Sequence, residues 1–381
     1  MMQLVKLQKP TSLFVFWFPL TKRFYRMRHQ GAILIRIKSF NLLYMVDEIT
    51  QENPKSEKSR LFCPLNRIRS EIFFSLVDYR NNYFTSDDPN KIIEFYHGFE
   101  NRDQLIQWMK ERPKGVTNIH EVDGDKDIIV VILTADFNGK YAKECRYNIF
   151  KGLHIVFVES GGREDFYFNY AHNCNVGIRK AMEYNPKWVV VSNDDMRRID
   201  EPQILKNNLM KFDPEEVDVL FTKESPDHYH SQPTYLGRPN SMGKILHRLL
   251  SIFRKGFFSI AYTKENFTTK FCLNVVLLPK HKVIKLFFHK IKPIFVTESF
   301  MILSGVYAKA NRGDILNESF CNGAEDWDLS FRIFYEFKKY NFIDYLIGEY
   351  TGGVLGAGKN RALRDIANIS LFNKIHEKDF E

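Results

Sequence analysis

Residues 128–133 (IIVVIL) decide the fold of this chain, because a continuous apolar run of this length is typical of a strand buried on both faces of a sheet. Two more apolar runs follow at residues 153–158 (LHIVFV) and 188–192 (WVVVS), and the stretches at 140–150 and 168–184 between the runs have the character of helices. This β-α-β-α-β alternation predicts an α/β fold with a doubly wound, mostly parallel sheet flanked by helices.

Polar side chains follow each of the three predicted strands. Residues 134–136 (TAD), 159–162 (ESGG) and 193–195 (NDD) come directly after the apolar runs. Ligands of open α/β sheets bind at the carboxyl ends of strands, so we expect the three segments to lie at one edge of the sheet. The sequence therefore predicts a ligand site at that edge.

The Asn193-Asp194-Asp195 segment has the chemistry of a site for a hard cation. Mg²⁺ and Mn²⁺ prefer oxygen ligands and keep positions open for water and substrate phosphates. One or two carboxylates at a strand end are enough when a diphosphate supplies the remaining ligands. The alternative is an ordinary Asn/Asp turn after a strand.

A second acidic segment, residues 323–332 (GAEDWDLSFR), comes at the start of a helix predicted over residues 327–339. Glu325 or Asp326 could act as a base, although acidic residues are also favoured at helix N-termini by the helix dipole. Asp328 and Arg332 are four residues apart and are interpreted as a structural pair on one helix face.

Taken in order, these segments resemble a family-two glycosyltransferase of the GT-A fold. Such enzymes carry Asp/Asn-x-Asp after a buried strand, as at residues 193–195, and Glu-Asp-x-Asp-Leu-x-x-Arg, as at residues 325–332. Residues 170–178 (YAHNCNVGI) match the family's aromatic-Ala-x-x-x-Asn-x-Gly-Ile stretch, and residues 317–320 (NESF) match its acidic segment near a Phe. The resemblance covers residues 127–375.

The resemblance implies a role for each segment. Asp195 would hold a divalent metal, Mn²⁺ or Mg²⁺, on the donor diphosphate, and Asp326 would be the general base, its pKa raised by the neighbouring Glu325. Many relatives have a metal-binding His further along the chain, where this sequence has residues 348–353 (GEYTGG). Metal binding would then rest on Asp195 alone or use a different third ligand. The residues expected to contact the nucleotide-sugar donor are Thr134, Asp136, Glu159, Asn175, Asn193, Asp194 and Lys359.

Residues 353–360 (GVLGAGKN) are a near match to a phosphate-binding P-loop. The hydroxyl that would bind magnesium is replaced by Asn360, and too little chain follows for the rest of such a fold. We interpret the segment as a Gly-rich lid with Lys359, Arg361 and Arg364 facing the diphosphate, or as a plain surface loop.

The composition narrows the class of protein. The chain has 381 residues and 15% aromatics, which argues against global disorder. Its five cysteines include no CxxC pair, so neither a disulfide framework nor a structural zinc site is expected. This use of cysteine fits a reducing compartment. No apolar run approaches the ~18 residues of a membrane span, and no signal-peptide cleavage site follows residues 13–20. We therefore predict a cytoplasmic protein.

The net charge of +9 is unevenly distributed. Residues 1–46 contain eight Lys/Arg and no acidic residue, and residues 241–293 contain eleven Lys/Arg and only Glu265. Basic residues stand beside Phe, Leu and Ile in residues 245–258 and 283–294, with helices expected over 244–253 and 283–291. Such segments favour an anionic membrane surface. No nucleic-acid-binding module is recognisable, so nucleic acid is not an expected partner.

The expected organisation has five parts. A basic apolar segment (1–46) precedes a helical extension and linker (47–120), a nucleotide-sugar-binding half (121–240), a basic amphipathic insertion (241–295) and an acceptor-binding half with a C-terminal helix (296–381). The predicted function is metal-assisted, inverting transfer of a sugar to a hydroxyl of a glycan or lipid-linked glycan, at the inner face of the membrane. Two alternatives stay open: a non-catalytic glycan- or nucleotide-sugar-binding protein on this fold, and a nucleotidyltransferase.

Overall fold

A computed structural model gives the structure of the chain and describes residues 26–29, 32–35, 84–161, 167–223, 228–242, 270–271, 273, 275–278, 288–297, 299–337, 339–350 and 360–381. The chain forms two compact units, Met1–Glu71 and Ile72–Glu381. In the first unit, β1 (Arg26–His29) pairs antiparallel with β2 (Ala32–Ile35). All further elements belong to the second unit, and the finer boundaries expected from composition stay predictions.

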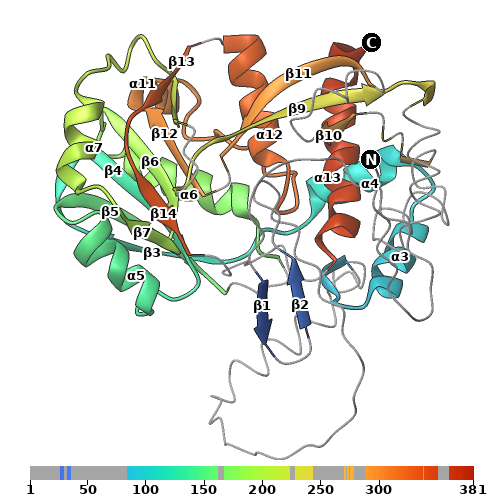
Figure 1. Cartoon of the computed structure of the whole chain (residues 1–381), viewed down its shortest axis with the longest axis horizontal. Coiled ribbons are helices and arrows are strands. Elements are labelled where there is room, and N and C mark those ends of the chain that lie inside the picture. Colours follow the sequence, from blue (N-terminus) through green and yellow to red (C-terminus); the bar gives the residue numbers. More distant parts are fainter. Residues whose placement is uncertain are drawn as a thin grey trace, which may run out of the picture. The chain divides into compact units, whose positions relative to one another are not determined.

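A seven-stranded sheet forms the centre of the second unit, in the order β13-β8-β12-β6-β4-β5-β3 (Figure 1). Five strands run in one direction, while β3 and β12 run antiparallel to their neighbours. The predicted α/β class with a mostly parallel central sheet is therefore confirmed. The strands are β3 (Thr117–Val122), β4 (Asp125–Thr134), β5 (Leu153–Ser160), β6 (Trp188–Asn193), β8 (Val219–Thr222), β12 (Phe300–Ser304) and β13 (Tyr340–Ile343).

Helices cover both faces of this sheet, as the apolar run in β4 requires. Ile128, Val130 and Ile132 of β4 belong to a core with side chains of α5, the adjoining π-helix η1, and α7. The alternate residues Ile129, Val131 and Leu133 belong to a core with α6, α11 and α12. These helices are α5 (Lys140–Glu144), η1 (Cys145–Ile149), α6 (Tyr170–Met182), α7 (Pro202–Leu209), α11 (Gly305–Ala310) and α12 (Glu325–Arg332), which continues as the π-helix η5 (Ile333–Phe337).

A third core lies outside the large sheet. It combines α3 (Pro89–His97), α4 (Arg102–Glu111) and α13 (Arg361–His376) with a small antiparallel sheet of order β10-β9-β11. The small-sheet strands are β9 (Gln232–Pro239), β10 (Val276–Leu278) and β11 (Phe288–Val296). Helix α12 contributes to two cores, since Leu329 packs toward the large sheet and Phe331 packs in the third core. The remaining elements are β7 (Met196–Arg198), its antiparallel partner β14 (Ile347–Glu349), and η6 (Glu377–Phe380).

The structure overturns two expectations about the C-terminal half. Residues 288–291, expected in a helix, begin strand β11, because residues 288–296 pair with β9 and a register shift after His289 absorbs their irregular pattern. Arg364 does not face a diphosphate: its guanidinium is buried and donates to the backbone oxygens of Phe84, Thr85 and Ser86. Lys359 and the expected helix at 244–253 lie outside the described residues. Within the described part, no helix has both the length and the hydropathy to span a membrane.

Candidate active site

The carboxyl ends of β4 and β6 are joined by a hydrogen bond between predicted site residues. Thr134 Oγ1 donates to Asp194 Oδ2 at 2.6 Å, and the backbone N–H of Asp136 donates to Thr134 Oγ1 at 3.2 Å. Burial raises the pKa of Asp194, and the nearby charge of Asp136 adds to the rise. Since the two strands are parallel neighbours, the sheet itself brings these residues to one edge.

Asp195 is a buried carboxylate in an acidic surrounding. The residue is only 8% exposed, and its Oδ1 has no hydrogen-bond partner among the described residues. Burial raises the pKa of Asp195 to about 7, with further contributions from the charges of Glu349 and Asp194. Glu349 reaches this place because β14 pairs with β7, and the backbone N–H of Tyr350 donates to the carbonyl oxygen of Asp195 at 2.8 Å.

The connection between β11 and β12 links this acidic group to the second acidic segment. Ser299 accepts the backbone N–H of Asn193 at 3.0 Å and donates through its hydroxyl to Glu349. Two residues earlier, the backbone N–H of Thr297 donates to Asp326 Oδ2 at 3.3 Å. Because Thr297 and Ser299 are two positions apart in the chain, their Cα atoms are at most about 7.6 Å apart. Segments that are far apart in the sequence, one ending β6 and one starting α12, therefore lie side by side.

Asp326 and Glu325 occupy the first turn of α12 and are both buried. The helix begins after Ala324, which has a left-handed backbone conformation (φ 65°). Asp326 Oδ1 accepts the backbone N–H of Trp327 at 3.0 Å, so together with the Thr297 contact both carboxylate oxygens are oriented by backbone donors.

Asp328 and Arg332 pair through Nε at 3.0 Å, as predicted for a structural pair on the helix. The structure adds His376 of α13, whose Nε2 lies 2.8 Å from Asp328 Oδ1. His376 and Asp328 are both buried, so this contact fastens α13 against α12.

Glu159 and Asp136 lie at the predicted edge but bond to the chain itself. Glu159 Oε1 accepts the backbone N–H of Phe137 at 2.8 Å, and Oε2 lies 2.9 Å from His120 Nε2. These contacts lower the pKa of Glu159. The ring of Phe137 in turn stacks on His120 and lies under the guanidinium of Arg146. Asp136 Oδ1 closes a turn by accepting the backbone N–H of Asn138 at 2.8 Å. In the structure, both carboxylates brace the loop after β4.

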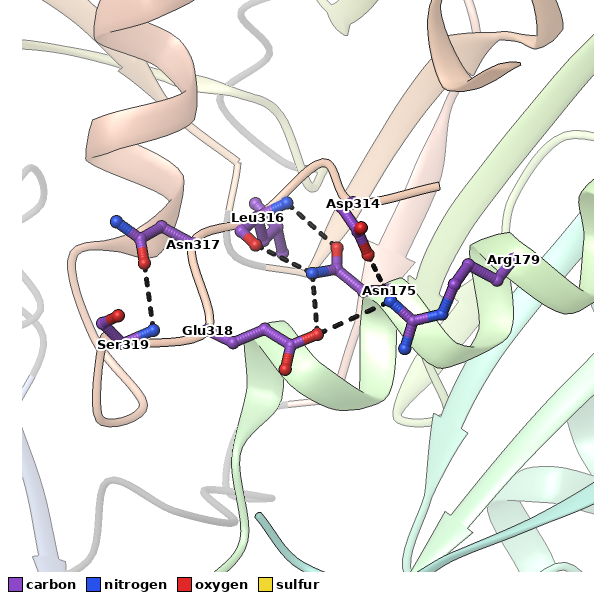
Figure 2. A pocket seen from close by; sticks show the side chains of 7 residues that line it. All are labelled: Asn175, Arg179, Asp314, Leu316, Asn317, Glu318 and Ser319. Carbon is purple, nitrogen blue, oxygen red and sulfur yellow. Dashed lines mark hydrogen bonds and ion pairs between the residues drawn. The ribbon is translucent and has the colours of Figure 1, made fainter. Parts of the chain in front are cut away.

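Asn175 lies elsewhere, in an open hollow between α6 and the segment before α12 (Figure 2). Its side chain donates to the carbonyl of Leu316 at 2.8 Å and to Glu318 Oε1 at 3.1 Å, and accepts the backbone N–H groups of Ile315 and Leu316, each at 3.0 Å. All four bonds hold the 315–318 segment on α6. These bonds give Asn175 a bracing role between α6 and this segment, and its predicted contact with the donor stays a prediction.

Two residues of the acidic group were not expected from the sequence. Glu349 falls in the segment where the resemblance predicts a His, and Ser299 belongs to no motif. Only the pairing of β14 with β7 and the hydroxyl contact to Glu349 give them their places. The presence of Glu349 in the segment that lacks the His was the one sequence signal that could have identified it as a site residue.

A divalent cation fits this group of carboxylates in one specific respect. The buried Oδ1 of Asp195 lacks a partner in the described part of the chain, and Glu349 and Asp194 raise its pKa by repulsion. A cation would supply the missing partner and relieve the repulsion. No set of three or more metal-ligating side chains is already assembled among the described residues.

Comparison with known proteins adds no relative. No protein-family model matches the chain, and no curated protein matches it. A function for the chain is therefore inferred from the site geometry and from the motifs.

Proposed function

We propose that the chain is a GT-A glycosyltransferase that moves a sugar from a nucleotide-sugar donor to an acceptor hydroxyl, with inversion at the anomeric carbon. The observation that carries the proposal is the β11–β12 connection. It bonds to Asn193 and Glu349 on the strand-end side and to Asp326 on the helix side. Two acidic groups that contact the same short connection suit a reaction in which one side holds the leaving group and the other takes up a proton.

The donor side would consist of Asp195, Glu349 and Asp194. Asp195, with Glu349 beside it, would hold Mn²⁺ or Mg²⁺, and the metal would supply charge neutralisation for the leaving diphosphate. Thr134 fixes the orientation of Asp194 by its hydrogen bond, and Ser299 does the same for Glu349. Burying these carboxylates together costs free energy because they lose water and repel one another, and a bound cation would offset that cost.

The acceptor side would be Asp326. In a single displacement, the acceptor oxygen attacks the anomeric carbon from the face opposite the diphosphate, and the carbon–oxygen bond to the diphosphate breaks with its electron pair. The hydroxyl proton passes to a carboxylate oxygen of Asp326. Backbone donors from Thr297 and Trp327 hold that carboxylate in place. One displacement with one base gives inversion.

The acceptor class rests on charge. We propose a glycan or a lipid-linked glycan at an anionic membrane surface, because basic residues stand beside large apolar residues in residues 1–46 and 241–293. Most of both segments lies outside the described residues.

The test compares Asp195→Asn with Asp326→Asn, both of which keep the side-chain volume. With Mn²⁺ and a panel of nucleotide sugars, we expect Asp195→Asn to lose metal-dependent donor binding in calorimetry. Asp326→Asn should keep donor binding and lose transfer by about 10²–10⁴-fold, the usual contribution of a general base. The exposed Asp344, paired with Lys223, offers a matched control in Asp344→Asn. Donor binding that survives in Asp195→Asn, or wild-type transfer in Asp326→Asn, would contradict the proposal.

A further inference from the structure

Tyr229 bonds to the β11–β12 connection and has no part in the chemistry described so far. Its hydroxyl donates to the carbonyl of Thr297. The same hydroxyl accepts the backbone N–H groups of Ser299 at 3.3 Å and Phe300 at 3.1 Å. A phenol hydroxyl both donates and accepts, so these bonds can form together. A single side-chain oxygen therefore holds the backbone of the connection at three residues.

The backbone of Tyr229 joins the strand that carries Glu349. Its N–H donates to the carbonyl of Ile347 at 2.9 Å, and the two residues form an antiparallel bridge. Ile347 begins β14 and Glu349 ends it. The ring of Tyr229 packs against the sheet core, and its centroid lies 6.3 Å from that of Phe300. Tyr229 therefore fixes the connection relative to β14.

The residues that Tyr229 bonds are the ones that orient groups of the proposed site. Ser299 donates through its hydroxyl to Glu349. Two positions earlier in the connection, the backbone N–H of Thr297 donates to Asp326 Oδ2 at 3.3 Å. The position of the connection therefore affects Glu349 on the metal side and Asp326 on the base side together.

We propose that Tyr229 is a positioning residue that aligns the metal side and the base side of the site through the β11–β12 connection. The proposal rests on the proposed function and adds a residue that acts on Glu349 and Asp326 through others. Groups that orient metal ligands commonly contribute about 10–100-fold to metal affinity or activity. Displacement of a reacting group by about 1 Å can cost about 100-fold in rate. Loss of the Tyr229 hydroxyl should therefore affect both sides.

The test uses Tyr229→Phe, which removes only the hydroxyl and keeps the ring and the backbone bond to Ile347. Titration with Mn²⁺, followed by EPR, should show about ten-fold weaker binding with the same stoichiometry of bound metal. With Mn²⁺ and the nucleotide sugar saturating, kcat for transfer should fall about ten-fold or more, while KM for the acceptor stays the same. A merely structural role would lower the stoichiometry through loss of folded protein and leave the affinity unchanged.

Tyr345→Phe is the matched control. Tyr345 is a buried residue of the same core, its ring centroid lies 6.1 Å from that of Phe300, and its hydroxyl has no hydrogen-bond partner within the described residues. This variant should bind Mn²⁺ and transfer sugar as wild type does. Ser299→Ala tests the route, because it removes the bond to Glu349 but keeps the N–H that Tyr229 accepts. In the Ser299→Ala background, Tyr229→Phe should weaken Mn²⁺ binding by less than about two-fold, since both changes break one chain of contacts.

Other results would overturn the positioning role in distinct ways. Wild-type affinity and kcat in Tyr229→Phe would contradict it and leave the proposed function standing. Full additivity with Ser299→Ala, an unchanged affinity at lower stoichiometry, or an equal loss in Tyr345→Phe would do the same. If wild type binds no Mn²⁺ and transfers no sugar, the proposed function fails and the positioning role fails with it.

Discussion

At the scale of single residues, Glu318 of the 317–320 motif has a structural role, because its carboxylate bonds to two residues of α6. His172 Nδ1 lies 2.8 Å from Glu318 Oε2, and Asn175 donates to Oε1 at 3.1 Å (Figure 2 shows the Asn175 bond). Partial burial alone would raise the pKa of Glu318, but the contacts with His172 and Asn175 lower it to about 2. The hollow beside α6 is therefore lined by a bonded network that fastens the segment before α12.

The lowered pKa of Glu318 predicts that the folded protein loses stability in acid. The folded-state pKa lies below the ordinary value of 4.5, so the unfolded state binds more protons in the acid range. The stabilisation is fully present above pH 4.5 and is lost as the pH falls toward 2. We expect Glu318→Gln to lower the free energy of unfolding at pH 7 by about 1–3 kcal/mol, after allowance for partial exposure.

Urea unfolding of both proteins at pH 7 and pH 3 measures this difference. The gap between wild type and Glu318→Gln should narrow at pH 3, and Glu183→Gln, at a mostly exposed site, serves as the control. An equal difference in unfolding free energy at both pH values would show that the stability contributed by the Glu318 contacts does not depend on the protonation of Glu318.

At the scale of elements, Gly177 sets the distance between α6 and the large sheet. A Cβ at this position would lie 2.2 Å from Val131 Cγ1 and 2.8 Å from Val158 Cγ2. The helix can approach β4 and β5 only because this residue has no side chain. The same close approach brings Asn175, two residues earlier, against the segment that leads into α12.

Gly177→Ala should therefore destabilise the protein, by about 1–3 kcal/mol, since the added methyl group forces the helix away from the sheet. The direction of the change in unfolding free energy is what tests the close packing. At an open helix position the same change stabilises by about 1 kcal/mol through helix propensity. Thermal and urea unfolding decide between the two, and a stabilised Gly177→Ala protein would rule out the close packing described for α6.

At the scale of the whole second unit, α12 and α13 connect the large sheet with the third core. Leu329 packs toward the sheet and Phe331 packs against Phe372 of α13 in the third core. The buried contact of Asp328 with His376 joins the same two helices at 2.8 Å. Because Asp326 begins α12, the helix that carries the proposed base is held from both sides.

We expect His376→Ala to cost about 2–4 kcal/mol, because it removes one partner of a buried carboxylate. Both cores should still unfold in one transition, which the fluorescence of Trp108 in the third core and Trp188 in the sheet core would report. Lys374 lies on the same helix as His376 and forms an exposed pair with Asp103 of α4, so Lys374→Ala should cost less than about 1 kcal/mol. Two separated transitions in wild type would show that α12 and α13 do not couple the cores.

The sequence by itself determined the elements whose signals are local. The apolar run at 128–133 lies within β4, the helix expected at residues 168–184 contains α6, and the Asp328–Arg332 pair forms as its spacing predicts. The strand ends that carry Thr134, Asp194 and Asp195 also follow from the sequence, since parallel neighbours end at one edge. The roles assigned to Asp195 and Asp326 stay predictions.

Only the tertiary structure decided the rest, because the signals are pairings between distant segments. Residues 288–291 look helical in isolation and become a strand because β9 offers a partner. Glu349 joins Asp195 through the β14–β7 pairing, and Arg364 turns inward to three backbone carbonyls far away in the sequence. Hydrogen-bond partners and burial of this kind are set by which surfaces meet on folding, and no local pattern of residue types records that.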